Sequence, residues 1–122
     1  MKHRLRLFTL VLLVLSFSAA SKTVICAGKV DRISMHANDK LIIKLDSMNV
    51  GAVVCAFNEV WQVPGTGYKT SPEMCSAFLS MFMHAKASNL AISGLYFDGD
   101  NVPDTCSSWE SWKNVNIRHL SY

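Results

Sequence analysis

The sequence contains few charged residues and little proline, and it lacks short-period repeats. Charged residues make up 17% of the 122 residues, and there are only three prolines and six glycines. The absence of a repeat excludes a collagen-like or low-complexity chain, and the low charge excludes a disordered tail or a coiled-coil rod. Half of the residues are hydrophobic, so length and composition together indicate a single folded domain.

No apolar run is long enough to cross a bilayer, which needs about 20 residues. The longest run, near the N-terminus, extends over about 14 residues and ends in small residues before Ala20. It follows the basic residues Lys2, Arg4 and Arg6. This pattern is typical of a secretory signal peptide, and a membrane anchor is the less fitting alternative. We therefore expect a signal peptide over 1–20, no membrane span after its cleavage, and one secreted or periplasmic domain over 21–122.

The N-terminal segment also accounts for the apparent excess of positive charge. The whole chain has 12 Lys and Arg residues and 9 Asp and Glu residues, a formal net charge of +3. Three of the basic residues belong to the expected signal peptide, which leaves nine of each sign, interspersed along the chain. Nucleic-acid binding normally needs a basic stripe that neutralises phosphates. We therefore expect no nucleic-acid partner.

The cysteines follow neither of the patterns that indicate metal or redox chemistry. Cys26, Cys55, Cys75 and Cys106 are separated by 29, 20 and 31 residues, with no C-x-x-C pair and no closely spaced histidine. Structural zinc uses ligands two to four residues apart, and a redox-active pair needs two local thiols. An even number of cysteines in an exported domain instead indicates two disulfides. Four cysteines allow three pairings, and the spacing alone does not choose among them.

Hydrophobic periodicity predicts five strands and one helix. Alternation of apolar and polar residues marks the strands, whereas apolar residues three and four apart mark the helix. The expected strands are 22–35, 41–46, 52–63, 90–97 and 115–120, and the expected helix is 71–88. Gly28 interrupts the first strand and predicts a bend or bulge. The helix begins either at a Thr70 capping box or at Ser71, and Asn89 is expected to end it in a left-handed conformation.

The order of these elements predicts the fold class. Three strands, a helix and two strands describe the oligonucleotide/oligosaccharide-binding (OB) fold, a five-stranded Greek-key barrel with a helix between strands 3 and 4. The alternative is a small α+β open sheet packed by one helix. In the barrel the long first strand pairs with the second and the fourth, which brings Cys26 near Cys106, and the helix brings Cys75 near Cys55. This layout favours the disulfides Cys26–Cys106 and Cys55–Cys75.

No residue pattern typical of a catalytic or metal site is present in the sequence. His36, His84 and His119 are isolated, and none lies in an H-E-x-x-H or His-x-His arrangement. The acidic turn at 98–104 lacks the glutamate that completes a calcium loop. There is also no G-x-S-x-G sequence and no phosphate-binding loop. We therefore expect no catalytic residues, no metal, no cofactor and no enzymatic activity.

Aromatic residues in the predicted loops are the remaining candidates for function. Trp109 and Trp112 flank Glu110 in a polar loop, Trp61 ends the third expected strand, and Tyr68 lies in a glycine-rich connection. Aromatic faces stack on sugar rings, and Trp and Tyr also contribute much of the binding energy in protein interfaces. These aromatic residues are therefore the candidate binding residues for a glycan or a protein surface. The alternative is that Trp109 or Trp112 turns inward, because a domain of about 100 residues needs large apolar side chains in its core.

One segment resembles a known family of bacterial toxin subunits. The run Ala-Val-Val-Cys-Ala-Phe-Asn-Glu-Val-Trp at 52–61, followed by an amphipathic helix and a strand, resembles the B subunit of subtilase cytotoxin. More loosely, it is similar to the glycan-binding B subunits of bacterial ring toxins, which share the barrel. The resemblance covers about 50 residues, and the connection 64–69 and Cys75 are additional to the family pattern. It implies an exported bacterial barrel that assembles with copies of itself and binds a carbohydrate or a protein surface.

Two functions follow as hypotheses from these observations. The first is a secreted or periplasmic non-enzymatic binding module, directed at a glycan and forming a homo-oligomer like a toxin B subunit. The second is a periplasmic inhibitor or immunity-type protein that binds one partner protein. Sugar binding and a multimeric particle favour the first hypothesis, whereas a monomer that captures a single protein favours the second.

Overall fold

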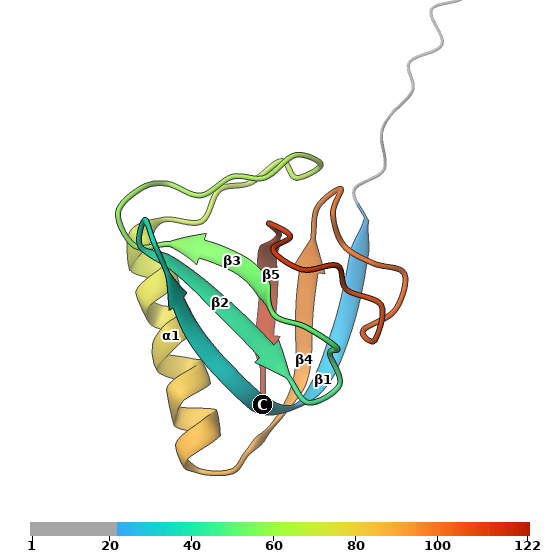
Figure 1. Ribbon diagram of the computed structural model, residues 1–122. Coiled ribbons are helices and arrows are strands. Elements are labelled where there is room, and N and C mark those ends of the chain that lie inside the picture. Colours follow the sequence, from blue (N-terminus) through green and yellow to red (C-terminus); the bar gives the residue numbers. More distant parts are fainter. Residues whose placement is uncertain (1–21) are drawn as a thin grey trace, which may run out of the picture.

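The fold is mainly β with a single helix, as the sequence predicts (Figure 1). The structure, a computed structural model, describes residues 22–122, so the predicted signal peptide lies outside the described residues. The elements are β1 (Thr23–His36), β2 (Lys40–Leu45), β3 (Ala52–Ala56), α1 (Pro72–Ala87), β4 (Ala91–Asp98) and β5 (Asn116–Ser121). The strands form one antiparallel sheet in the order β3-β2-β1-β4-β5. One sheet packed by one helix fits the α+β alternative.

Strand β1 is long because it belongs to both halves of the sheet. Its first part, up to Lys29, pairs with β4, and its second part, from Val30, pairs with β2. The strand changes direction at the predicted position, where Gly28 adopts a φ of +134° beside a register shift. A side chain at Gly28 would collide with the carboxylate of Asp46. That carboxylate accepts a hydrogen bond from the Lys29 amide at 3.1 Å, which fixes the bend.

The bend brings β3, at one end of the strand order, against the segment that leads into β5. The Val53 amide donates to the carbonyl of Lys113 at 2.9 Å, and the Val115 amide donates to the carbonyl of Val53 at 3.0 Å. These bonds form a short parallel bridge between Val53 and Asn114. In Figure 1, β1 passes from the pair β4–β5 to the pair β2–β3, and α1 runs along one side of the sheet.

Helix α1 follows the sequence prediction closely. Ser71 caps it by accepting a hydrogen bond from the Met74 amide at 3.1 Å, and Pro72 occupies the first turn, where its missing N–H removes no helical hydrogen bond. Asn89 follows the helix with a φ of +53°. The buried face of the helix consists of Cys75, Phe78, Phe82 and Ala85. It meets the inner face of the sheet, on which Leu41, Ile43 and Leu45 are fully buried.

The third strand is shorter than the predicted range 52–63, which was wrong at its C-terminal end. β3 ends at Ala56, opposite Lys40, which is the first residue of β2. Phe57 therefore has no further partner in β2, and its amide donates instead to the carbonyl of Asp39 in the β1–β2 turn. The chain then enters a long connection to α1, within which Trp61 and Thr70 form an isolated antiparallel bridge.

Both favoured disulfides are present. Cys26–Cys106 joins β1 to the connection between β4 and β5, and Cys55–Cys75 joins β3 to α1. Cys26, Cys55 and Cys75 are fully buried. No cysteine among residues 22–122 is free. Two disulfides are typical of proteins that fold outside the cytosol.

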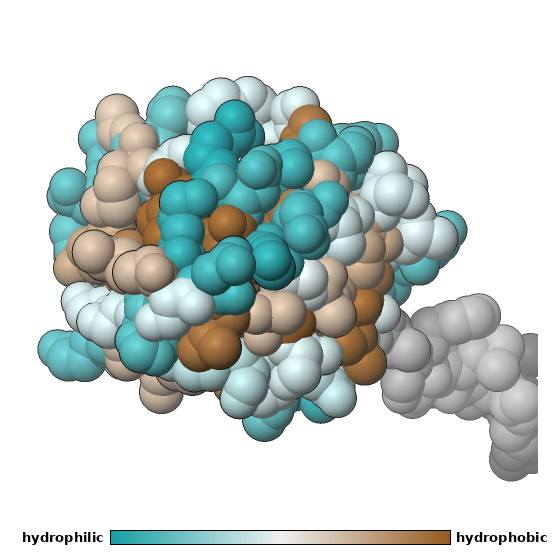
Figure 2. All heavy atoms as spheres, turned by 90° about the horizontal axis from the view of Figure 1, so that it is seen from below, coloured by the Kyte–Doolittle hydropathy of each residue, from teal (hydrophilic) through white to brown (hydrophobic). Residues whose placement is uncertain are grey.

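The described part of the chain has no membrane-crossing helix, and the surface at one end of the molecule has no broad apolar area. Within residues 22–122, no helix has the length and apolar character needed to cross a membrane. Seen from the end at which the C-terminus lies, polar side chains cover much of the centre, and the apolar patches between them are small and separate (Figure 2).

We predict that the two disulfides stabilise the fold unequally. Cys26–Cys106 closes a segment of 80 residues and Cys55–Cys75 one of 20. The chain-entropy model gives about 4.5 kcal/mol for the longer loop and about 3 kcal/mol for the shorter. Urea unfolding of the Cys26→Ala/Cys106→Ala and Cys55→Ala/Cys75→Ala double variants measures both losses. A larger loss of unfolding free energy in the second variant would contradict the prediction.

Candidate functional site

A groove lies on the outer face of β1, β2 and β3, beside the exposed indole of Trp112. Its volume is about 310 Å³. The residues that line it and carry the argument are Arg32, Ser34, His36, Ile42, Val53 and Trp112. Strands supply the floor, whereas the loop between β4 and β5 supplies one wall. A rigid surface and an exposed aromatic side chain therefore meet at one place.

The floor of the groove is a row of residues across three strands. Ser34 pairs with Ile42, and Ile42 pairs with Val53. A register shift between β2 and β3 places Val54 as an extra residue opposite the step from Leu41 to Ile42. Because of this bulge, Val53 lies beside Ile42 on the outer face, while Cys55 lies on the inner face and bonds to the helix. The bulge thus supplies an apolar floor without removing the disulfide from the core.

The wall that carries Trp112 is held at several points. Cys106 is bonded to β1 through Cys26. The Asn49 side chain donates to the carbonyl of Trp109 and accepts from its amide, both at 2.7 Å. The indole of Trp109 is buried and packs edge-on against Phe97, with ring centroids 5.0 Å apart. These restraints fix the loop before Trp112, and the Val53 amide holds it after Trp112 by donating to the carbonyl of Lys113.

Trp112 itself is the exposed member of this loop. Its side chain is 62% exposed and its φ is +64°, in the left-handed region that non-glycine residues rarely adopt. The His36 ring meets its indole edge-on, with centroids 4.7 Å apart. The imidazole Nδ1 lies 2.9 Å from the carbonyl of Ala37, which orients the ring. Trp112 is therefore supported in place by the end of β1 while one side of its indole faces solvent.

The polar groups of the groove are donors rather than acids. Arg32, His36 and two serine hydroxyls line it, and no aspartate or glutamate does. Within residues 22–122, Arg32 makes no ion pair with an acidic side chain. The groove can therefore place a flat apolar surface against an indole and offer hydrogen bonds to oxygen atoms around it.

Of the four aromatic residues predicted to bind, two belong to the core. Trp61 is 6% exposed, and its Nε1 donates to the carbonyl of Val115 at 2.9 Å. Trp109 is 3% exposed. The prediction that Trp61 and Trp109 lie open to a ligand is therefore wrong, and the alternative for Trp109, that it turns inward, is confirmed. Both indoles add large apolar side chains to the core of a small domain.

Tyr68 is half-buried and belongs to a different cluster. Its hydroxyl donates to Asp98 at 2.8 Å, and the same carboxylate accepts from Thr23 at 2.6 Å and from Arg118 at 2.9 Å. Asp98 is 3% exposed, so these donors compensate for its burial. Burial of the phenol and its hydrogen bond to Asp98 raise the pKa of Tyr68 well above its usual range. Tyr68 thus ties the connection before α1 to β4 and β5.

The sequence gives little sign of the other groove residues. His36 lies one residue beyond the predicted strand 22–35, and in the structure it ends β1 with its ring against Trp112. Arg32 and Ile42 fall within the predicted strands 22–35 and 41–46, where nothing in the sequence distinguishes them as groove residues. The one available signal was Ile42, an isoleucine that alternates with Lys40 and Lys44 on the outward side of the strand, since the outer face of a half-buried strand is normally polar.

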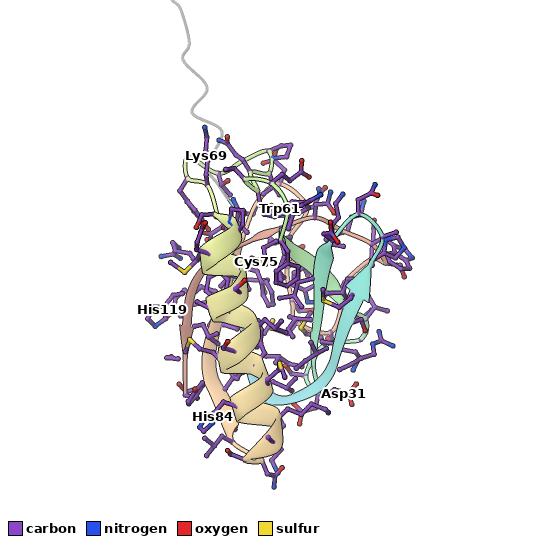
Figure 3. The ribbon with its side chains drawn as sticks, turned by 90° about the vertical axis from the view of Figure 1, so that its left-hand side faces the viewer. Asp31, Trp61, Lys69, Cys75, His84 and His119 are labelled. Atoms are coloured by element: carbon purple, nitrogen blue, oxygen red, sulfur yellow. A yellow bond between two sulfur atoms is a disulfide. The ribbon has the colours of Figure 1, made fainter. Side chains whose placement is uncertain are left out.

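The three described histidines do not come together. His36 ends β1, His84 lies on α1, and His119 lies on β5. Figure 3 shows His84 and His119 on the outside of the molecule, whereas Trp61 and Cys75 lie between α1 and the sheet. Among residues 22–122, no three His, Cys, Asp or Glu side chains are grouped so as to hold a metal ion.

We predict that Tyr68 ionises later than an ordinary tyrosine, whose pKa is about 10. Because the folded state holds Tyr68 protonated to a higher pH than the unfolded chain, its contribution to stability is complete below pH 10. That contribution is lost as the pH rises through the folded-state pKa. An ultraviolet titration of the native protein should contain a late phenolate step that Tyr68→Phe lacks. A late step that persists in the variant would contradict this assignment.

Comparison with known proteins gives no similar protein. No family model matches the chain, and neither the curated proteins nor the solved structures contain a match. The resemblance of residues 52–61 to toxin B subunits therefore stays a prediction, and the function has to be inferred from the groove itself.

Proposed function

We propose that the strands form an OB-type barrel rather than a flat open sheet. The helix lies between β3 and β4 in the sequence, and the bent β1 pairs with both β2 and β4. The bridge between Val53 and Asn114 links the two ends of the strand order in parallel. These features support a closed Greek-key arrangement.

We propose further that the protein is an exported, non-enzymatic binding module that takes up a carbohydrate in the groove beside Trp112. The exposed indole of Trp112 is the observation that carries this proposal. Trp61 and Trp109 are buried, whereas Trp112 is held open to solvent over a formed groove. A large aromatic side chain exposed at a fixed position on a formed site is typical of a binding surface.

The chemistry and size of the groove suit a sugar. The indole face packs on the C–H groups of a sugar ring, and Arg32, His36 and the two serines supply hydrogen bonds to hydroxyl oxygens. A volume of about 310 Å³ lies at the small end of ligand sites, which suits one or two rings. The site is also restrained by a disulfide and by the Asn49 contact, so binding should require little ordering of the loop.

Two further observations support a binding role outside the cytosol. All four cysteines are committed to disulfides, which leaves no thiol nucleophile and is typical of secreted or periplasmic proteins. The described histidines lie on separate elements, whereas acid–base catalysis needs such groups within reach of one another.

A glycan array tests the proposal, with the oxidised protein, Trp112→Ala and Tyr122→Ala compared side by side. Tyr122 is a matched control because it is an exposed aromatic residue, 47% accessible, that lies outside the groove. We expect binding to a subset of glycans, a loss of at least tenfold in affinity for Trp112→Ala, and little change for Tyr122→Ala. Losing a central aromatic contact commonly costs about 2 kcal/mol or more. Absence of binding to every glycan, or equal binding by all three proteins, would contradict the proposal.

We also propose that the protein assembles into a homo-oligomer, as the toxin-like resemblance implies. Native mass spectrometry of the oxidised protein measures the particle mass directly. A ring of several copies, such as a pentamer, is the expected result. A monomer at all concentrations would contradict oligomerisation and favour the inhibitor-type hypothesis instead.

A further inference from the structure

We propose that a second groove, between α1 and the free edge of β5, binds an extended peptide segment of a partner protein. The segment would carry alternating acidic and apolar residues and would add to the sheet as a strand beside β5. This groove has a volume of about 380 Å³ and shares no lining residue with the groove beside Trp112. The inference is therefore independent of carbohydrate binding.

The backbone of β5 has a partner on one side only. β5 ends the strand order and pairs with β4 alone along its length. The contact with β3 stops at Val115, one residue before β5 begins. In the described part of the chain, no other backbone or side-chain group hydrogen-bonds to the main chain of 117–121. An unpaired edge of this kind is a template for strand addition.

The side chains that would normally protect such an edge are turned away from it. Natural edge strands are often guarded by charged residues. Here the register shift leaves Arg118 as a bulged residue, and its guanidinium lies 5.2 Å from the ring centroid of Tyr96 in β4. Its Nε is also bound to Asp98. His119 likewise packs edge-on against Tyr96, at 5.2 Å between centroids. Both side chains therefore lie at the rim of the groove over β4.

The opposite wall is an apolar strip of the helix. Met74, Phe78 and Met81 line the groove from α1, and Ile117 and Leu120 line it from β5. Met74 is 49% exposed although it is apolar. A groove between a helix and an edge strand binds extended peptides well because main-chain bonds give affinity and alternate side chains enter the apolar side. The flexible methionines can adapt to the residues that enter.

The charge of the rim selects the sequence of the peptide. Lys69, Arg118 and His119 line the groove, and no aspartate or glutamate does. Because Arg118 is already paired with Asp98, Lys69 is the cation most available to a new partner; it makes no ion pair within residues 22–122. Figure 3 shows Lys69 at the helix-start end of this side of the molecule and His119 on its outer flank. Acidic side chains on the solvent side of an added strand would meet these groups.

The test uses three synthetic probes with the oxidised protein. They are the capped peptide Glu-Val-Glu-Leu-Glu-Val, the same peptide with lysine in place of glutamate, and the glutamate peptide N-methylated at alternate residues. Binding is followed by nuclear magnetic resonance titration, and amide hydrogen exchange is measured at 117–121. We expect the glutamate peptide to bind and to slow exchange at these amides. The lysine peptide should bind about tenfold more weakly, and the N-methylated peptide should not bind because it cannot pair with β5.

Two variants of helix α1 test whether the peptide binds in this groove. Met81→Glu introduces a carboxylate into the groove and should weaken binding of the glutamate peptide at least tenfold. Met83→Glu is the matched control, since Met83 lies on the same helix, is 56% exposed and does not line the groove. Trp112→Ala should leave peptide binding unchanged, which separates this proposal from the carbohydrate site.

Three outcomes would overturn the proposal. The first is equal binding of the glutamate and lysine peptides. The second is the absence of any change in exchange at 117–121 with the glutamate peptide. The third is protection of those amides without peptide that increases with protein concentration, because a second copy of the chain would then be the occupant of the edge.

Discussion

The change of direction of β1 at Gly28 is the constraint on which the rest of the architecture depends. A single strand of 14 residues pairs with β4 before the bend and with β2 after it. A positive φ at Gly28 and the adjoining carboxylate of Asp46 leave no room for a side chain there. Because β2 and β3 follow β1 through short connections, the bend also carries β3 around to Val115. A straight β1 would leave Val53 and Val115 at opposite edges of a flat sheet.

The outer face of this curved sheet forms a groove only because the loop between β4 and β5 is held against it. Cys106 ties the loop to β1, and Asn49 and Phe97 hold Trp109. The following residues must therefore pass directly over β1 and β3, with Trp112 against His36. Trp109 and Trp112 thus have complementary roles, since the buried Trp109 anchors the loop and the exposed Trp112 faces solvent. Restraint of this kind lowers the entropy that a ligand must overcome.

Local patterns predicted much of the fold. Hydrophobic periodicity predicted the strands and the helix, and Gly28 predicted the bend in the first strand. Ser71 was one of the two predicted helix N-caps, and Asn89 was predicted to end the helix. The favoured disulfide pairing followed from the element order. The end of β3 could not be predicted, because it depends on where β2 begins.

The groove residues were harder to predict because their exposure, like the end of β3, depends on contacts with other parts of the chain. Burial of Trp61 depends on the carbonyl of Val115, which lies 54 residues away in the sequence. The apolar floor depends on a bulge at Val54 that sets which residues face outward. Neither contact leaves a mark in the local sequence. Trp112, which is exposed, could therefore be separated from the buried Trp61 and Trp109 only in three dimensions.

Hydrogen exchange of the Val53 and Val115 amides tests the central claim most directly. Both amides donate across the junction between β3 and the segment before β5. If the bend in β1 joins the two ends of the strand order, these amides should exchange as slowly as those in the β1–β2 ladder. Exchange at the rate of exposed loop amides would mean that the junction is open and that the strands form an uncurled sheet.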